Sequence, residues 1–524
     1  MYQILVSDSM SGEGLTPLLG KPNIEVIQKN VKEVEDFLHE FDALLVRSST
    51  IVTAELLSKM TNLKIIARAG VGVDNIDVEA ATKHGVVVIN APDGNTLSTA
   101  ELTFAMISSL VRHIPQANIS VKSREWNRSA FVGTELAGKQ LGIVGLGRIG
   151  SEIAKRAKAF DMRVYVYDPF LTKSRAEEIG VTSCTLDQLL ATSDIITVHT
   201  PLTNETRGLL GNENLAKTKK GVYLVNCARG GIIDESALVT YLENGHVAGA
   251  ALDVFEVEPP MSNKLLEFDQ VIVTPHLGAS TKEAQLNVAS QVATEVVSFL
   301  EGKPVTSSVN LPTLSKDLYE KIQPFYELAN KIGSILSQCM KQAVKEVSIT
   351  YAGTVTNLET TFITRSLLSG FLQSRVATTV NAVNAAVITQ ERGITFGETF
   401  SSNTFGYANS ITVRATGESN SFEIQGTHVT GYGARIVSLN GFKIDFSPEG
   451  NLLYIQHTDK PGVIGRVGKI LGDIDVNIAT MQVGRKQLGG EAIMMLSFDM
   501  PLQDEVIERL HKSQDIVSIR KIDL

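Results

Sequence analysis

Cysteine is scarce in this chain, which has only three among its 524 residues. Cys184, Cys227 and Cys339 lie far apart, so they cannot form a disulfide framework or a four-thiolate metal site. We therefore predict a protein without a metal centre that works in a reducing compartment.

Long apolar runs and strongly basic segments are also missing. No window reaches the roughly 18 uninterrupted apolar residues that a membrane-spanning helix needs. The first ten residues, MYQILVSDSM, lack the basic region of a targeting segment. No basic run exceeds a short cluster such as KTKKG at 217–221, and the net charge is −9. These absences disfavour nucleic acid or an anionic membrane as the main partner, and we expect a cytoplasmic protein.

The pattern of the first 300 residues is that of an α/β protein. Short β-branched runs alternate with helical patterns, which is typical of a doubly wound parallel sheet. A long helical pattern at 98–116 interrupts this rhythm, which then restarts and ends in a second long helix at 280–302. We predict two Rossmann-like lobes, with the second inserted in the first.

The pattern also predicts where the domains begin and end. The first lobe would comprise 1–97 and 284–312, and the second 98–283. An α+β domain is predicted at 313–448, in which the dipeptide Asn-Gly at 440–441 indicates a hairpin turn. At 451–524 the order strand, helix, strand, strand, helix, strand predicts a ferredoxin-like fold.

The stretch LGIVGLGRIG at 141–150 predicts a dinucleotide site. Gly145, Gly147 and Gly150 satisfy G-x-G-x-x-G between an apolar run and a helical pattern, where glycines permit a tight turn and close approach of a pyrophosphate. Asp168 ends the next strand, roughly 20 residues after the first glycine. An acid there can accept hydrogen bonds from ribose hydroxyls and would repel a 2′-phosphate, so NAD is favoured over NADP. Lys173 and Arg175 nearby favour NADP, and a turn cap is the alternative role for Asp168.

Three strand ends of the second lobe carry side chains suited to oxidising a hydroxyl-bearing carbon. That reaction needs a base and a fixed cation. Arg229 in NCARGGIIDE could hold a carboxylate through two parallel hydrogen bonds. His276 in VIVTPHLGAS could serve as the base, with Asp253, Glu256 or Glu258 fixing its tautomer. The residues alone leave the partner open, and a lone histidine after a strand is otherwise a surface or core residue.

Five segments together carry a family resemblance: GLGRIG, VHTPLTNETRGLL, NCARGGIIDE, ALDVFEVEPP and TPHLGAST. In this order they resemble the D-isomer-specific 2-hydroxyacid dehydrogenases over residues 1 to about 312. The tail resembles the long-form members of that family, which carry an intervening domain and a C-terminal ACT domain. The resemblance implies oxidation of 3-phospho-D-glycerate to 3-phosphohydroxypyruvate with NAD, the first step of L-serine biosynthesis.

The resemblance also implies roles for individual residues. Arg229 would bind substrate, His276 would exchange the proton of the C2 hydroxyl, and Glu258 would be the partner of His276. The implied cofactor contacts are Gly145, Gly147, Arg148, Ile149, Gly150, Asp168, Thr200, Cys227, Ala228, Asp253 and Gly278. The implied substrate contacts are Arg47, Arg68, Val71, Gly72 and, from a second subunit, Arg128. On the residues alone, Asp253 can equally be a helix cap and Cys227 a small core residue.

The segment HTDKPGVIGRVGKILGDIDVNIAT resembles the effector motif of ACT domains, with His457, Asp459 and Asn477 at the matching positions. Its Pro-Gly pair opens a helix whose free amides can hold an amino-acid carboxylate. Serine-inhibited relatives often have asparagine where Asp459 stands, so L-serine is one possible effector and a purely assembling unit is the alternative. Family members are commonly homodimers or homotetramers.

Two other functions stay open at this point. One is a glyoxylate or hydroxypyruvate reductase of the same family, although such enzymes usually lack a 200-residue extension. The other is an NADH-sensing, corepressor-like binding protein, since fold does not fix function. The acidic net charge and the ACT-like tail favour an enzyme.

Overall fold

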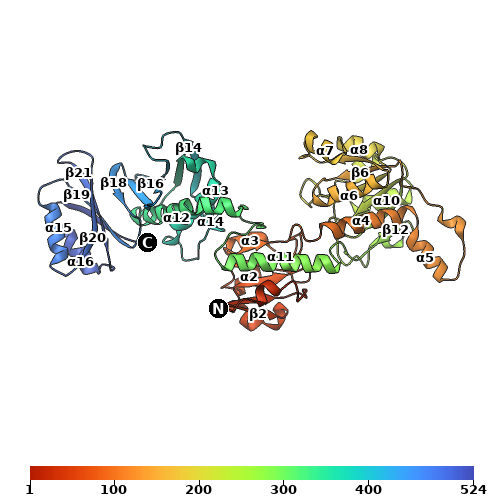
Figure 1. Cartoon of the computed structure of the whole chain (residues 1–524), viewed down its shortest axis with the longest axis horizontal. Coiled ribbons are helices and arrows are strands. Elements are labelled where there is room, and N and C mark those ends of the chain that lie inside the picture. The colour runs from red at the N-terminus through yellow and green to blue at the C-terminus, as the bar shows by residue number, and fades with distance from the viewer.

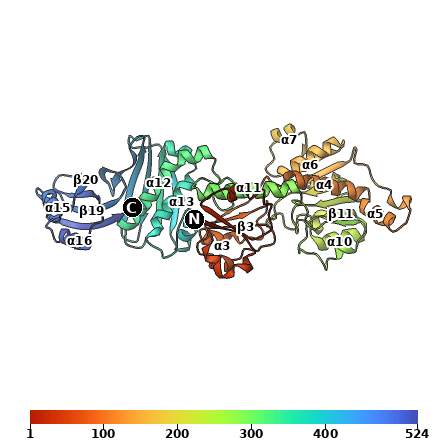
Figure 2. The same cartoon turned by 60° about the horizontal axis from the view of Figure 1, so that its bottom comes forward.

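The computed structural model describes residues 1–524 and contains four β-sheets, each in its own unit. The units lie in a row, with the second lobe at one end and the C-terminal unit at the other (Figure 1). The N-terminal lobe lies between the second lobe and the α+β domain, and a second view shows the same order (Figure 2).

The first lobe is built on a five-stranded parallel sheet of order β2-β1-β3-β4-β5. Its strands are β1 Tyr2–Val6, β2 Ile24–Gln28, β3 Ala43–Val46, β4 Ile65–Arg68 and β5 Val87–Ile89. Its helices are α1 Thr16–Leu19, α2 Ala54–Lys59 and α3 Val78–Lys83, with 3₁₀ turns η1 Val31–Glu33 and η2 Glu35–Glu40. Leu44 and Leu45 are adjacent and both 0% exposed, so both faces of this sheet are covered, as parallel sheets require.

The second lobe has a seven-stranded parallel sheet of order β12-β11-β10-β9-β6-β7-β8. Its strands are β6 Gln140–Val144, β7 Arg163–Tyr167, β8 Thr182–Ser183, β9 Ile195–Val198, β10 Val222–Asn226, β11 Val247–Leu252 and β12 Val271–Val273. Its helices are α6 Arg148–Ala159, α7 Lys173–Ile179, α8 Leu186–Thr192, α9 Asn212–Ala216 and α10 Glu235–Glu243, with the 3₁₀ turn η4 Lys264–Glu267. The strand order reverses between β6 and β9, and open α/β sheets bind ligands beyond the carboxyl ends of the strands at such a point.

Two long helices connect the lobes: α4 Thr96–Val111 and α11 Lys282–Leu300. Helix α11 packs on α1 and β4 of the first lobe. The chain then runs along β5, where the amide of Val309 donates to the carbonyl of Val88 (2.8 Å). The chain thus leaves the first lobe through α4 and returns to it through α11, so the second lobe is inserted in the first. The predicted fold class is confirmed.

The single helix predicted at 98–116 is wrong, because the structure has two helices there. Helix α4 ends at Val111, and α5 Ile114–Lys122 begins after His113, whose φ is +53°. Pro115 lies in the first turn of α5. Its ring would clash with the carbonyl four residues earlier in a continuous helix, so the break is a consequence of proline.

The α+β domain has a six-stranded sheet of order β14-β13-β15-β16-β17-β18 covered by two long helices. The strands are β13 Glu346–Gly353, β14 Thr395–Ser401, β15 Asn409–Thr416, β16 Ser421–Val429, β17 Gly433–Leu439 and β18 Phe442–Phe446. The helices are α12 Lys316–Cys339, α13 Thr360–Gln373 and α14 Ala385–Glu391, with the 3₁₀ turn η5 Thr354–Asn357. Asn440 and Gly441 have φ values of +48° and +80°. The predicted two-residue hairpin between β17 and β18 is confirmed, because both residues are left-handed as a type I′ turn requires.

The C-terminal unit is a four-stranded antiparallel sheet of order β20-β21-β19-β22 with two helices on one face. Its elements are β19 Asn451–Thr458, α15 Val463–Gly472, β20 Ile478–Arg485, β21 Glu491–Phe498, α16 Asp504–His511 and β22 Ile516–Asp523. This order of elements is the predicted ferredoxin-like one. No helix anywhere in the structure has the length and apolarity required to cross a membrane.

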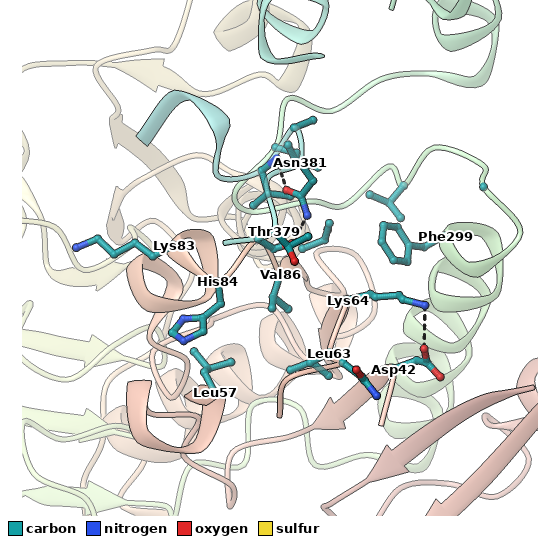
Figure 3. A pocket seen from close by; sticks show the side chains of 18 of the residues that line it. Asp42, Leu57, Leu63, Lys64, Lys83, His84, Val86, Phe299, Thr379 and Asn381 are labelled. Atoms are coloured by element: carbon teal, nitrogen blue, oxygen red, sulfur yellow. Dashed lines mark hydrogen bonds and ion pairs between the residues drawn. The ribbon is translucent and has the colours of Figure 1, made fainter. Parts of the chain in front are cut away.

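A cavity of about 1050 Å³ lies where the α+β domain contacts the first lobe (Figure 3). Asn381 bridges the two units by donating its side-chain amide to the carbonyl of Gly85 (2.7 Å). The lysines that line the cavity are all paired with carboxylates, as Lys64 is with Asp42 (2.9 Å). None of the predicted catalytic residues lines it. This cavity therefore lies apart from the predicted catalytic residues.

Candidate active site

The glycine turn between β6 and α6 has the shape of a phosphate-binding turn. Gly145 has a φ of +94°, and a Cβ there would lie 2.7 Å from the carbonyl oxygen of His199. A Cβ on Gly150 would overlap the carbonyl oxygen of Gly145. A Cβ on Gly147 would meet nothing within 4 Å, so the backbone before α6 faces open space. Because the free amides at a helix N-terminus attract anions, this turn fits the pyrophosphate of a dinucleotide.

Asp168 joins this turn to the end of β7. Its Oδ2 accepts a hydrogen bond from the amide of Leu146 (2.8 Å), and its Oδ1 accepts one from the amide of Phe170 (2.8 Å). Each carboxylate oxygen has a further lone pair that can accept from a hydroxyl. The side chain is half-buried, so it can cap the turn and face a ribose at once.

We expect Asp168→Ala to weaken NAD binding about tenfold or more and to relax the rejection of NADP. The reason is the loss of charge-assisted hydrogen bonds, each worth roughly 1.5–3 kcal/mol, together with the loss of repulsion toward a 2′-phosphate. The measurement is KM for NAD and for NADP, with Glu177→Ala as an exposed acidic control in the same lobe. An unchanged preference between the two cofactors would contradict the ribose role.

Three more predicted cofactor residues surround the turn. The hydroxyl of Thr200 is buried without a hydrogen-bond partner, which is the kind of group that a ligand or water satisfies. Arg148 pairs through Nε with Oδ1 of Asp93 in the first lobe (2.6 Å), and its side chain is 60% exposed. Ile149 packs against the core of the second lobe.

Cys227 follows β10 and lies in the core. Its thiol points at the sulfur of Met106 (3.5 Å), and burial raises its pKa to about 12. The side chain therefore belongs to the core of the second lobe, and a cofactor contact at this position would come from the backbone.

The thiols are expected to be unreactive in the folded protein. Burial raises the pKa of Cys339 to about 12 as well, and it also raises the pKa of the half-buried Cys184. Since the thiolate is the reactive species, a chromogenic thiol reagent at pH 8 is expected to label at most Cys184 in the native protein and all three cysteines after unfolding. Rapid loss of activity on labelling would contradict this expectation.

His276 and Glu258 form a pair at the end of β12. Nδ1 of His276 lies 2.8 Å from Oε2 of Glu258, and 47% and 39% of the two side chains are exposed. Burial raises the pKa of Glu258, but the hydrogen bond and charge of His276 outweigh this effect and lower it overall. Glu256 instead exchanges hydrogen bonds with Glu235. Because Nδ1 is engaged, Nε2 of His276 is the nitrogen left to face a substrate.

Asp253 holds the loop that carries His276. Its carboxylate is fully buried, with Oδ1 accepting from the Thr274 hydroxyl (2.6 Å) and the Leu277 amide (2.7 Å). Its Oδ2 accepts from the amide of Gly278 (3.0 Å). Burial raises the pKa of Asp253. The carboxylate of Asp253 therefore supports the loop that carries His276, and its predicted place along the cofactor stays a prediction.

Arg229 extends from the end of β10 to a loop of the first lobe. Its Nε donates to Oδ2 of Asp74 (3.0 Å) and its Nη1 to the carbonyl of Ala228 (2.6 Å). The guanidinium lies so close to Gly72 that a Cβ there would overlap Nη2. The charge of Arg229 also contributes to the lowered pKa of Glu258. The three predicted catalytic side chains therefore lie near one another where the second lobe meets the 71–74 loop of the first, and we call this place the cleft.

Two further arginines approach this cleft from the first lobe. Arg68 has a buried Nε without a partner, and its pKa falls to about 10 because of burial first and then repulsion by Arg229 and Arg47. The loop beside them is fixed by Asn90, which donates to the carbonyl of Val71 (2.5 Å). The result is a cationic cluster suited to an anion.

Comparison with known proteins agrees with this arrangement. Residues 104–278 match the family model described as the NAD binding domain of D-isomer specific 2-hydroxyacid dehydrogenase. Residues 321–440 match the D-3-phosphoglycerate dehydrogenase intervening domain, and residues 452–514 match the ACT domain. D-3-phosphoglycerate dehydrogenase of Bacillus subtilis is 65% identical over 524 residues, which cover 100% of both chains. The chain belongs to the D-3-phosphoglycerate dehydrogenase family.

More distant proteins agree with this assignment. D-3-phosphoglycerate dehydrogenase of Archaeoglobus fulgidus is 44% identical, with 100% of both chains covered. The solved structure of D-lactate dehydrogenase from Aquifex aeolicus, complexed with NAD and lactic acid, is 31% identical. It matches 59% of this chain and 100% of its own with a TM-score of 0.54. The chain is thus an NAD-dependent oxidoreductase, and what it has beyond the two catalytic lobes is the intervening and ACT domains.

Arg128 is the predicted substrate residue that the single chain does not bring to the cleft. It begins the 3₁₀ turn η3 Arg128–Phe131, on an arm that follows α5. Helix α5 has no buried residue, and Trp126 is 80% exposed. The arm extends from the second lobe away from the rest of the molecule (Figure 1).

The predicted effector residues are not brought together within one ACT unit. His457 lies at one end of the sheet, opposite Ala492 of β21. Asn477 precedes β20 at the other end and donates to Asp499 (3.1 Å). Because a strand rises about 3.3 Å per residue, the 8 residues of β20 keep Asn477 far from His457 within one chain.

The half of the effector motif at His457 is held by hydrogen bonds within the chain. His457 is 2% exposed, and its Nε2 is buried without a partner. Asp459 accepts hydrogen bonds from the amide of Gly489 and from Arg485, both at 3.1 Å, and these contacts lower its pKa. The carboxylate at this position is therefore already satisfied within the chain.

Sequence reasoning missed two acids of the first lobe, Asp74 and Asp93. They pair with Arg229 and Arg148 respectively, each of which belongs to the other lobe. Both acids lie in loops, where no periodic pattern marks a side chain, so only the spatial arrangement reveals them.

Proposed function

We propose that the protein oxidises 3-phospho-D-glycerate to 3-phosphohydroxypyruvate with NAD, the first step of L-serine biosynthesis. The observation that carries this proposal is the convergence of Arg229 with the His276–Glu258 pair on the cleft between the lobes. The match of the whole chain to D-3-phosphoglycerate dehydrogenases supports the choice of substrate.

Different residues of the cleft accept the proton, bind the substrate carboxylate and hold the cofactor. Nε2 of His276 accepts the proton of the C2 hydroxyl, while Glu258 stabilises the imidazolium that results. Arg229 and the amide of Gly72 hold the substrate carboxylate and so fix the orientation of C2. A bound NAD would supply the acceptor for the hydride of C2. The glycine turn, Asp168 and Thr200 would hold it, because that part of the chain offers open backbone and an unsatisfied hydroxyl.

The phosphate of the substrate needs cations of its own. We assign it to Arg47 and Arg68 of the first lobe and to Arg128 of a second subunit. Arg68 is half-buried with a free Nε, so its charge is poorly solvated without an anion. The exposed arm that carries Arg128 fits a contact between subunits, in a homodimer or homotetramer.

Regulation and organisation follow from the same proposal. We propose that an amino acid, L-serine being the first candidate, binds the ACT unit near His457 and Asp459, with Asn477 supplied by a second subunit. The domain limits are proposed at 1–97 with 284–312, 98–283, 313–448 and 451–524. The three unpaired cysteines fit a cytoplasmic enzyme.

Purified full-length protein with NAD and 3-phosphoglycerate is expected to produce NADH, followed by its absorbance. Turnover of glyoxylate or hydroxypyruvate with NADH, without activity on 3-phosphoglycerate, would favour the rival reductase. Tight NADH binding without turnover of any 2-hydroxy acid would favour a cofactor-sensing protein.

A further inference from the structure

Arg229 has more hydrogen-bond donors than a substrate carboxylate uses. A guanidinium carries five N–H groups in a fixed plane. The chain itself occupies one on Nε, through Asp74 at 3.0 Å, and one on Nη1, through the carbonyl of Ala228 at 2.6 Å. Three N–H groups remain, two of them on Nη2.

The contact with Asp74 decides where those three groups point. A Cβ on Gly72 would overlap Nη2 of Arg229 and lie 2.7 Å from Oδ2 of Asp74. The guanidinium is therefore laid against the backbone of the 71–74 loop, with Nη2 beside Gly72. Two asparagines fix this loop. Asn90 donates a hydrogen bond to the carbonyl of Val71 within it (2.5 Å), and Asn75, which directly follows it, donates one to the carbonyl of Thr50 (2.6 Å).

The charges around the loop also depend on Asp74. Repulsion by Arg229 is one of the effects that lower the pKa of Arg68, and the carboxylate of Asp74 acts against them. The Asp74 side chain is 66% exposed. An ion pair that is exposed to this degree adds little to the stability of the fold. The main effect of the contact is therefore to orient the guanidinium of Arg229.

We propose that Asp74 is a positioning residue, which grips Nε of Arg229 across the cleft and thereby aims Nη2 at the substrate carboxylate above Gly72. This inference rests on the proposed function, because it takes Arg229 to be the carboxylate-binding group. Asp74 belongs to the first lobe and Arg229 to the second. The same hydrogen bond therefore links the two lobes and fixes their relative position before substrate binds.

The test compares Asp74→Ala with Asp74→Asn in the full-length protein. Asp74→Ala is expected to raise KM for 3-phosphoglycerate about tenfold or more, since small misplacements of a clamp are costly. The kcat and KM for NAD are expected to stay within about threefold, the pattern of lost uniform binding. Asp74→Asn keeps an oxygen acceptor for Nε and is expected to recover most of the affinity. Asp36→Asn, an exposed acid of the same lobe, is the charge control.

A double-mutant cycle separates positioning from a general loss of structure. In the Arg229→Lys background there is no Nε to grip, so adding Asp74→Ala is expected to change kcat/KM by less than about twofold. Equal effects of Asp74→Ala in both backgrounds, or an unchanged KM in the single variant, would overturn the proposal. If the unmodified protein does not oxidise 3-phosphoglycerate, the proposed function fails instead. The cycle is then measured with the 2-hydroxy acid that the protein does oxidise.

Discussion

His276→Ala is expected to lower turnover at least about a hundredfold, which is the usual reach of general acid–base catalysis. The imidazole is the only histidine ring in the cleft that is paired with a carboxylate, at 2.8 Å from Glu258. Its removal leaves the C2 hydroxyl without an acceptor for its proton. The measurement is kcat at saturating NAD and 3-phosphoglycerate.

The control for this experiment is His39→Ala, which changes an exposed histidine of the first lobe. It is expected to retain full turnover. NAD binding by His276→Ala, followed by fluorescence or calorimetry, is expected to stay close to that of the unmodified protein, because the glycine turn and Asp168 lie on other strands. Near-normal kcat in His276→Ala would remove this residue from the reaction.

Arg229→Ala is expected to lower kcat/KM for 3-phosphoglycerate at least about a hundredfold. Two charge-assisted hydrogen bonds to a carboxylate contribute roughly 1.5–3 kcal/mol each, and each 1.4 kcal/mol is a factor of ten. The variant also leaves Asp74 without its partner and next to the position of an anionic substrate. Steady-state kinetics over a wide range of substrate concentration measures both kcat and KM.

Arg175→Ala is the matched control, since Arg175 is an exposed arginine of the same lobe that pairs only with Glu178. It is expected to leave kcat/KM for 3-phosphoglycerate unchanged. A substrate without a carboxylate gains nothing from Arg229, so the ratio between such a compound and 3-phosphoglycerate is expected to collapse in Arg229→Ala. A loss that is equal for both compounds would show a structural defect instead.

The elements that sequence reasoning located best are those with a strict local requirement. Gly145 must be glycine because its φ is +94°, and Asn440 and Gly441 are both left-handed in their hairpin. These requirements depend on a few adjacent residues, so they are visible in the chain as a short motif. The helix predicted at 98–116 failed for the opposite reason, since the apolar spacing continued past Pro115 while the backbone could not.

In the candidate site, too, short motifs marked some residues while the path of the chain decided their partners. The motifs marked Arg229 and His276, but they left three acids as partners for the histidine. Glu258 is the partner because the chain turns back after β11, whereas Glu256 is engaged with Glu235 and Asp253 lies beneath the loop. The effector motif marked three residues, and the structure adds that they lie at opposite ends of one sheet within the chain.

The sequence by itself determined the α/β class, the glycine turn with its acidic strand end, and the family, since each of these depends on side-chain identity over short spacings. Only the tertiary structure decided that Asp74 grips Arg229, that Asp253 supports a loop, and that the ACT residues stand apart in one chain. The physical reason is that these relations join segments up to 155 residues apart. Such contacts are set by how sheets and lobes pack, and no local pattern of the chain encodes which distant partner a charged side chain meets.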